Sequence, residues 1–196
     1  MNKASILFIG FLITLATSWI GLVLLPASHY NTQAAQLPTA FFTNQEIIAR
    51  GQQVYQANGC IYCHSQQVGT RHFRSDQERG WGNRRTVSTD YLRDTVALLG
   101  TMRTGPDLAN IGIRNPSPQW HYLHLYDPQL TSPGSIMPPL RFLFEPAKEN
   151  PSADAFTLPD GRRIEPTDDA RALVAYLLSL KRSQGELPEA FEPPPK

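Results

Sequence analysis

Several features that define common protein classes are scarce in this sequence of 196 residues. Two cysteines are too few for a scaffold built on disulfide bonds. The 18 basic and 17 acidic residues nearly cancel, to a net charge of +1. A nucleic-acid-binding protein needs a strong basic excess, so we expect no nucleic acid among the partners. Charged residues make up only 18% of the chain, below the roughly 25% of an ordinary soluble domain.

The shortage of charge is concentrated in residues 4–25, which contain no charged side chain. A helix of this mostly apolar segment would be roughly 33 Å long, which matches a hydrocarbon core of about 30 Å. The alternative is a cleaved signal peptide, but its apolar region usually has about 7–15 residues, and no small-x-small cleavage site follows Leu25. We therefore predict a single transmembrane anchor in a lipid bilayer, with a helix that ends at Pro26.

The orientation of this anchor depends on few charges. Lys3 and the amino terminus precede the apolar segment, and the next basic residue after it is Arg50. The positive-inside rule then places the N-terminus in the cytoplasm and the rest of the chain outside it.

Two helices are expected at the ends of the remaining chain. Thr43 and Glu46 fit a capping box, and apolar residues at helical spacing continue to about Ala57, where Asn58-Gly59 ends the helix. Near the C-terminus, Thr167 can cap a helix, and two acidic residues follow it in the first turn. The apolar stripe of this last helix consists of Leu173, Tyr176, Leu177 and Leu180.

The part between these helices shows little periodicity. Residues 65–136 are predicted to be mainly loops, with a possible helix across Tyr91–Leu99. The turn signal Pro159-Asp160-Gly161 predicts a hairpin between residues 155–158 and 162–165. The predicted organisation is an anchor (1–26), a linker (27–42), a domain (43–185) with an insertion near 145–166, and a proline-rich tail (186–196).

The motif that carries the chemistry is Cys60-Ile61-Tyr62-Cys63-His64, the attachment signature of c-type haem. The two thiols are spaced to add across the two vinyl groups of one haem, and His64 follows directly as the proximal iron ligand. We therefore expect one covalently bound haem c, around which a loop-rich chain could fold.

Two other interpretations of the cysteine pair are weaker. A thioredoxin-like dithiol would lie at a helix start within alternating strands and helices, a pattern that this sequence lacks. A structural zinc site needs four nitrogen or sulfur ligands, and there is no second cysteine pair.

The sixth iron ligand has to come from elsewhere in the chain. Met137 precedes Pro138-Pro139, which hold the backbone extended, and it lies far enough from His64 to pass round the haem edge. Met102 and a histidine are the weaker alternatives. Ligation by His64 and Met137 would raise the reduction potential relative to two histidines, as suits an electron carrier.

The segment Gly105-Pro106-Asp107-Leu108 is expected to support the proximal ligand. A haem-ligating histidine usually donates its other ring N–H to a carbonyl group, and Pro106 keeps its C=O while Gly105 allows close approach. Leu108 would then pack on the haem ring. The Arg103 guanidinium and the Trp120 indole N–H are candidates for contact with haem propionates. A solvated or subunit-contact face is the alternative for Arg103, and packing is the alternative for Trp120.

The two terminal helices resemble those of class I cytochrome c, a mainly α fold. In that fold the helices cross at a glycine. Gly51 fits as the crossing glycine, and Tyr55 and Tyr176 fit as the aromatic residues packed beside it.

A narrower resemblance covers roughly residues 50–144. The haem motif, Arg103-Thr104-Gly105-Pro106-Asp107-Leu108, Trp120-His121-x-x-His124-Leu125 and Gly134-Ser135-Ile136-Met137-Pro138 are similar, in this order, to the monohaem second subunit of cbb3-type cytochrome c oxidase. The single N-terminal anchor agrees with this family. His121 and His124 are interpreted as satisfied packing residues or propionate neighbours rather than as a second metal site.

This resemblance implies a place in a larger complex. The family's subunit holds its haem outside the bacterial inner membrane and passes electrons from a donor cytochrome to the catalytic haem–copper subunit, which reduces O2 to water. The predicted span contains no histidine, so this chain would be a relay without a catalytic centre. The alternatives are the cytochrome subunit of nitric oxide reductase and a free membrane-tethered shuttle.

Overall fold

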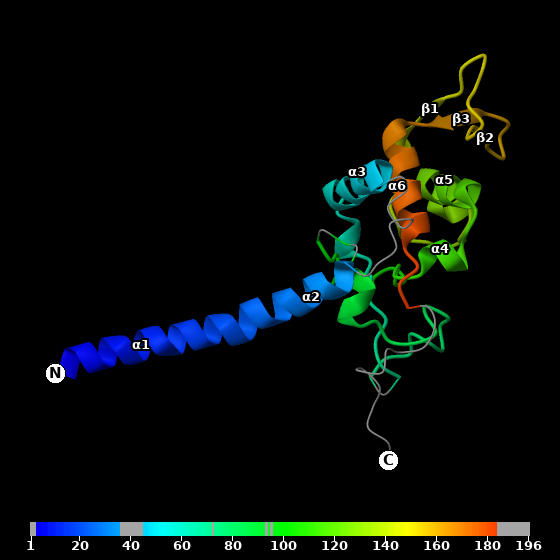
Figure 1. The fold of residues 1–196 in the computed structure, drawn as a ribbon. Coiled ribbons are helices and arrows are strands. Elements are labelled where there is room, and N and C mark those ends of the chain that lie inside the picture. Colours follow the sequence, from blue (N-terminus) through cyan, green and yellow to red (C-terminus); the bar gives the residue numbers. More distant parts are fainter. Residues whose placement is uncertain (1–2, 36–44, 72, 93, 95, 184–196) are drawn as a thin grey trace. The chain divides into compact units, whose positions relative to one another are not determined.

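The computed structural model describes residues 3–35, 45–71, 73–92, 94 and 96–183 (Figure 1). Helices dominate, and the described residues contain one small sheet. This confirms the predicted mainly α class. The chain forms two compact units, each described by itself: the first holds the N-terminal helices and the turn Ser88–Tyr91, and the second holds most of the other described residues.

The first unit contains the expected membrane anchor. Helix α1 (Lys3–Trp19) continues through a π-helical turn (Ile20–Leu24) into α2 (Leu25–Ala35). Within the described residues, Lys3–Thr32 is the one helix long and apolar enough to cross a membrane. Hydroxyl groups in this helix bond to carbonyl groups of its preceding turns, as a lipid environment requires.

The predicted helix end at Pro26 is wrong, because the helix continues to Ala35. Proline normally breaks a helix since it lacks an N–H and its ring clashes with the carbonyl four residues earlier. Here the wider π turn comes directly before it, and the Leu25 N–H donates to the Ile20 carbonyl five residues back. This change of hydrogen-bond register is a known way to accommodate such a disruption. The remainder of the predicted linker, residues 36–42, lies outside the described residues.

The second unit is built on the two predicted terminal helices. Helix α3 (Gln45–Ala57) is followed by Gly59, whose φ of 68° is left-handed. Helix α6 (Asp168–Ser179) is capped as predicted, since the Thr167 side chain accepts the Ala170 N–H at 3.3 Å. Its predicted apolar stripe is buried. The predicted cap at Thr43 lies outside the described residues.

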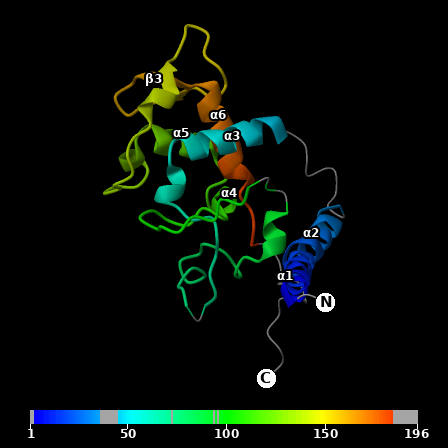
Figure 2. The same ribbon diagram turned by 90° about the vertical axis from the view of Figure 1, so that its left-hand side faces the viewer.

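Helix α3 lies across α6 (Figure 2), and this is the most extensive contact between elements of the unit. Gly51 makes the crossing possible, because a Cβ atom there would lie 2.0 Å from the Ala172 carbonyl oxygen. Beside it, the rings of Tyr55 and Tyr176 meet edge-to-face with centroids 5.5 Å apart. The crossing predicted for the class I cytochrome c fold is therefore present.

Replacing Gly51 by alanine should destabilise this unit. Overpacking of a tight contact costs about 1–3 kcal/mol or more, and the gain in helix propensity of about 1 kcal/mol offsets it only in part. We expect a net loss of about 2 kcal/mol, measured from the midpoint of chemical denaturation in detergent. Gln53→Ala on the exposed face of the same helix is the control. Equal midpoints for the two variants would contradict the tight crossing.

Two helices form in the region that the sequence predicts to be mainly loops. Helix α4 (Ile111–Arg114) is one turn long, and α5 (Pro118–Tyr126) has two and a half turns. The start of α5 was readable from Ser117-Pro118: the Ser117 hydroxyl accepts the Trp120 N–H, and proline is favoured in the first turn. Single 3₁₀ turns complete the unit at Cys60–Tyr62, Pro128–Leu130 and Arg141–Leu143.

The possible helix across Tyr91–Leu99 is wrong for the described residues, because residues 96–99 are not helical. The Leu99 carbonyl accepts the Gln66 N–H at 2.8 Å, and the Gly100 carbonyl accepts the Gln67 side-chain amide at 2.9 Å. Hydrogen bonds to a distant segment therefore replace those of a local helix.

A small antiparallel sheet contains the predicted hairpin. Its strand order is β1 (Phe144–Pro146), β3 (Arg163–Pro166), β2 (Phe156–Thr157), with Phe144 opposite Pro166 and Phe156 opposite Ile164. Phe144 and Phe156 pack on each other and on aromatic side chains of α5. The predicted insertion is therefore part of the core. The predicted tail at residues 186–196 lies outside the described residues.

Candidate functional site

The two cysteines lie on one turn directly after α3. Cys60 begins the 3₁₀ turn and is half-buried against the core, whereas Cys63 follows it and is exposed. The backbone N–H groups of Cys63 and His64 both donate to the Cys60 carbonyl, at 3.2 and 3.0 Å. This local bonding fixes both thiols and the histidine relative to one another.

The His64 ring has a defined partner. Its Nδ1 lies 2.7 Å from the Pro106 carbonyl oxygen, the contact expected from the sequence. A carbonyl can only accept, so Nδ1 carries the proton and Nε2 of the neutral ring keeps its lone pair. Burial lowers the pKa of His64 from its ordinary value, although the Pro106 bond opposes this shift. The ring is thus a neutral imidazole with one nitrogen available to a metal.

Gly105 allows the two segments to approach this closely. A Cβ atom at Gly105 would lie 2.2 Å from Cε1 of His64, well inside contact distance. The Gly105 N–H donates to the Cys63 carbonyl at 2.9 Å, and the Leu108 N–H donates to the Ser65 carbonyl at 2.7 Å. The chain on either side of His64 is therefore bonded to the chain on either side of Pro106.

The Cys60 thiol has no sign of activation. Burial raises its pKa to about 11, whereas a reactive thiolate needs a lowered pKa. The described residues also contain no group of three or more histidine, cysteine or acidic side chains that could hold a metal ion. The zinc interpretation therefore gains no support.

The two candidate methionines differ in their surroundings. Met102 is 56% exposed, whereas Met137 is half-buried and packs against the core. The Met137 N–H donates to the Ser135 hydroxyl at 3.2 Å, and the Leu140 N–H donates to the Leu125 carbonyl at 2.8 Å. The Met137 loop is therefore tied to α5, and ligation of iron by its sulfur stays a prediction.

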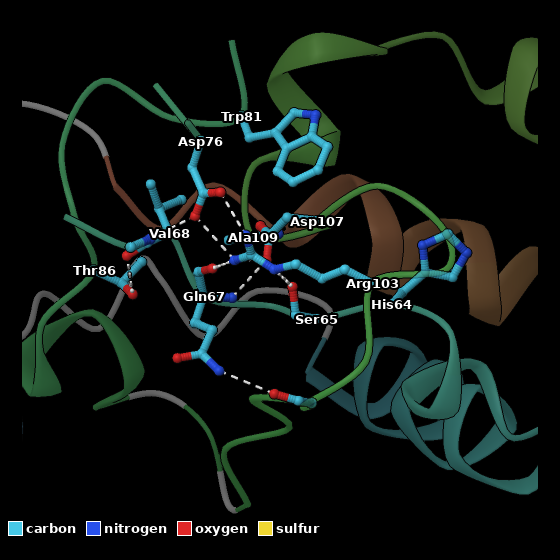
Figure 3. Close-up of polar contacts among 12 residues, drawn as sticks. His64, Ser65, Gln67, Val68, Asp76, Trp81, Thr86, Arg103, Asp107 and Ala109 are labelled. Carbon is cyan, nitrogen blue, oxygen red and sulfur yellow. Dashed lines mark hydrogen bonds and ion pairs between the residues drawn. The ribbon is translucent and has the colours of Figure 1, made fainter. Parts of the chain in front are cut away.

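Arg103 binds the loop that follows His64. Its guanidinium forms an ion pair with Asp76 and also donates to the Gln67 carbonyl and the Ser65 hydroxyl, at 2.6 and 2.8 Å (Figure 3). The side chain is only 20% exposed, because a buried carboxylate, a carbonyl and a hydroxyl accept from its guanidinium. Contact of Arg103 with a haem propionate stays a prediction.

The two acidic partners of this arginine were missed by sequence reasoning. Burial raises the pKa of Asp76, but hydrogen bonds from Arg103 and Gly69 and nearby positive charge outweigh burial, so the net shift is downward. Burial raises the pKa of Asp107 above its ordinary value, with partial compensation by hydrogen bonds from Ser65 and two backbone N–H groups. Asp76 is 27 residues away from Arg103, with no local pattern that connects the two. Asp107 lies only four residues after Arg103, but no role for it was expected from the sequence.

Three aromatic side chains of α5, Trp120, His121 and His124, contact one another. His124 directly precedes Leu125, whose carbonyl accepts a hydrogen bond from the Met137 loop. The rings of Trp120 and His124 stack with centroids 4.7 Å apart, and Nδ1 of His124 lies 2.6 Å from the Thr131 hydroxyl. Burial, with the charges of His121 and His64, lowers the pKa of His124 to about 4. His121 is buried and bonds the Asn115 carbonyl at 2.8 Å. Both histidines are satisfied by protein groups, as expected, and propionate contact by Trp120 stays a prediction.

The residues present fit a haem group. The site offers a neutral imidazole with Nε2 available, two thiols on one turn, and half-buried apolar side chains around them. An apolar group that covered these half-buried side chains would complete the core. The half-buried apolar residues that pack against the core include Ile61, Leu108, Leu123, Met137 and Leu140.

Crossed terminal helices, a Cys-x-x-Cys-His turn after the first of them and a proline carbonyl on the histidine define a c-type cytochrome domain, here preceded by a membrane-spanning helix. Residues 1–157 match the family described as cytochrome c oxidase, mono-heme subunit/FixO. The chain belongs to this family. A search of curated proteins gives no match.

Membership of this family has direct consequences. The family supports a single haem c in this chain, a role in electron transport and association with the catalytic subunit of the oxidase. The apolar N-terminal helix fits a membrane anchor, and the oxidase of this family is membrane-bound.

Proposed function

We propose that this chain is the electron relay of a cbb3-type terminal oxidase. It receives electrons from a donor cytochrome and passes them to the catalytic haem–copper subunit, which reduces O2 to water. The observation that carries this proposal is the His64 ring, fixed by the Pro106 carbonyl beside two thiols, in a chain of the FixO family.

Each residue of the site has a defined part in binding. Cys60 and Cys63 would each add their S–H across one vinyl group, which forms a carbon–sulfur bond and leaves the hydrogen on the neighbouring carbon. His64 would bind the iron through Nε2, while Pro106 keeps the ring orientation and increases its basicity. Met137 would supply the sixth ligand. When bound, haem c supplies a one-electron iron couple.

We further propose that the haem domain lies outside the bacterial inner membrane and the N-terminus in the cytoplasm. The basic residue Lys3 before the apolar helix supports this orientation. Haem attachment outside the membrane would also leave the domain accessible to a donor cytochrome.

Extraction with a mild detergent tests the place in a complex. We expect the chain to purify with a multi-span subunit that contains haem and copper, and the purified assembly to consume oxygen. Consumption of nitric oxide instead would assign the chain to a nitric oxide reductase. Recovery of the full yield as a single chain would favour a free tethered shuttle.

A further inference from the structure

The ion pair between Arg103 and Asp76 is largely buried. The Asp76 side chain is 2% exposed and the Arg103 side chain 20%. Arg103 binds both carboxylate oxygens through its two terminal nitrogens, at 2.9 Å for Nη2–Oδ2. A buried ion pair contributes little net stability, because desolvation of both charges offsets their attraction. The geometry that this pair imposes therefore calls for an explanation.

Arg103 reaches both segments that surround the proximal histidine. Its Nε donates to the Ser65 hydroxyl at 2.8 Å, and Nη2 donates to the Gln67 carbonyl at 2.6 Å. These residues directly follow His64. Nη2 also lies 3.6 Å from Oδ2 of Asp107, which directly follows Pro106. One guanidinium thus contacts the chain on both sides of the bond between His64 and Pro106.

Asp107 closes the connection between these two segments. It is fully buried, and its Oδ2 accepts the Ser65 hydroxyl at 2.6 Å and the Gln67 N–H at 2.8 Å. Its Oδ1 accepts the Ala109 N–H at 2.8 Å. Arg103 and Asp107 both form hydrogen bonds with Ser65 and Gln67. Any displacement of the arginine would therefore shift the segment after His64 relative to the segment after Pro106.

Asp76 anchors the arginine to a third segment. Its Oδ2 accepts the Gly69 N–H at 2.6 Å, and its backbone carbonyl accepts the Trp81 N–H at 2.9 Å. The Trp81 ring lies against the guanidinium, 5.4 Å from Cζ. In Figure 3 the guanidinium lies among these partners, while the His64 ring points away from the ion pair. The planar guanidinium group of arginine can donate hydrogen bonds to these partners at the same time, whereas the ammonium group of a lysine cannot.

We propose that Arg103, held by Asp76, is a positioning residue that fixes the orientation of the His64 ring and so the reduction potential of the bound haem. This inference rests on the proposed function, because it takes His64 as the iron ligand. Arg103 acts through Ser65, Gln67 and Asp107, and it does not touch the iron.

Amide hydrogen exchange on the full chain in detergent tests whether Arg103 holds the segments around His64 and Pro106 together. We expect Arg103→Lys and the double variant Arg103→Met with Asp76→Leu to speed exchange of the Gly105 and Leu108 amides about tenfold. The double variant leaves no unpaired charge at the pair itself. Exchange of the hairpin amides Ala147 and Leu158 should stay within about twofold of the original chain, because they bond within the sheet region.

Arg162→Lys is the matched control, since its pair with Asp160 is exposed. The second readout is the haem itself: both Arg103 variants should show a broadened ferric spin-resonance signal and a shifted reduction potential, unlike the control. Asp76→Asn, which keeps the side-chain volume, replaces the double variant if that variant does not accumulate.

The outcomes separate the two proposals. Unchanged amide exchange at Gly105 and Leu108 together with an unchanged reduction potential would overturn the proposed positioning role of Arg103. Equal acceleration of exchange at all amides would also overturn it, because it would indicate a purely structural role. Rescue of every readout by Arg103→Lys would also overturn it, because a charge alone would then suffice. A colourless original chain would instead remove the proposed function.

Discussion

The double variant Cys60→Ala, Cys63→Ala is expected to carry no covalently bound haem and to lose the folded haem domain. Without haem, the half-buried apolar residues would keep their remaining exposed surface in water. Full burial of one such side chain contributes about 1.5–3 kcal/mol, so covering the exposed half of five of them contributes roughly 4–7 kcal/mol, comparable with the stability of a typical domain, about 5–15 kcal/mol.

Haem staining of the denatured chain and near-ultraviolet circular dichroism measure these two losses. Tyr62→Phe is the control, because Tyr62 lies between the cysteines and is exposed. It should keep both the haem stain and the folded signal. Haem that stays attached to the double variant through denaturation would refute the assignment of the two thiols.

The second large effect is expected from Met137→Ala. Loss of the thioether ligand should remove the weak near-infrared sulfur-to-iron absorption of the ferric protein. The reduction potential should fall by at least about 59 mV, which is tenfold in the equilibrium constant of a one-electron couple, because methionine ligation raises the potential. The half-buried position of Met137 in a loop tied to α5 supports this choice of ligand.

Met102→Ala is the matched control for this experiment, since Met102 is exposed. It should leave both the absorption and the potential unchanged. If instead Met102→Ala removes the near-infrared band and Met137→Ala keeps it, the sixth ligand is assigned to the wrong residue.

Much of the site was predictable because its signals are local or have a fixed spacing. The Cys60-x-x-Cys63-His64 motif needs no tertiary information, and the carbonyl expected beside His64 follows from the needs of a ligating imidazole. The capped helix at Thr167 was predictable in the same way, from capping chemistry, whereas the crossing at Gly51 was expected from the resemblance to class I cytochrome c.

The features that were not predicted have a common physical origin. The strongest partner of Arg103 is Asp76, which no local pattern connects to it. Residues 96–99 do not form a helix, and the Leu99 and Gly100 carbonyl groups accept from the segment after His64. In both cases the deciding contacts join residues that lie far apart in the sequence.

The sequence by itself determined the membrane helix, the haem attachment motif and the two terminal helices of the haem domain, because each depends on hydrophobic periodicity, end-capping residues or covalent spacing along the chain. Only the tertiary structure decided that the N-terminal helix passes through Pro26 and that one arginine binds both segments around the proximal histidine. A hydrogen-bond register and the choice of a buried ionic partner depend on three-dimensional packing, which amino-acid order specifies only through the complete fold.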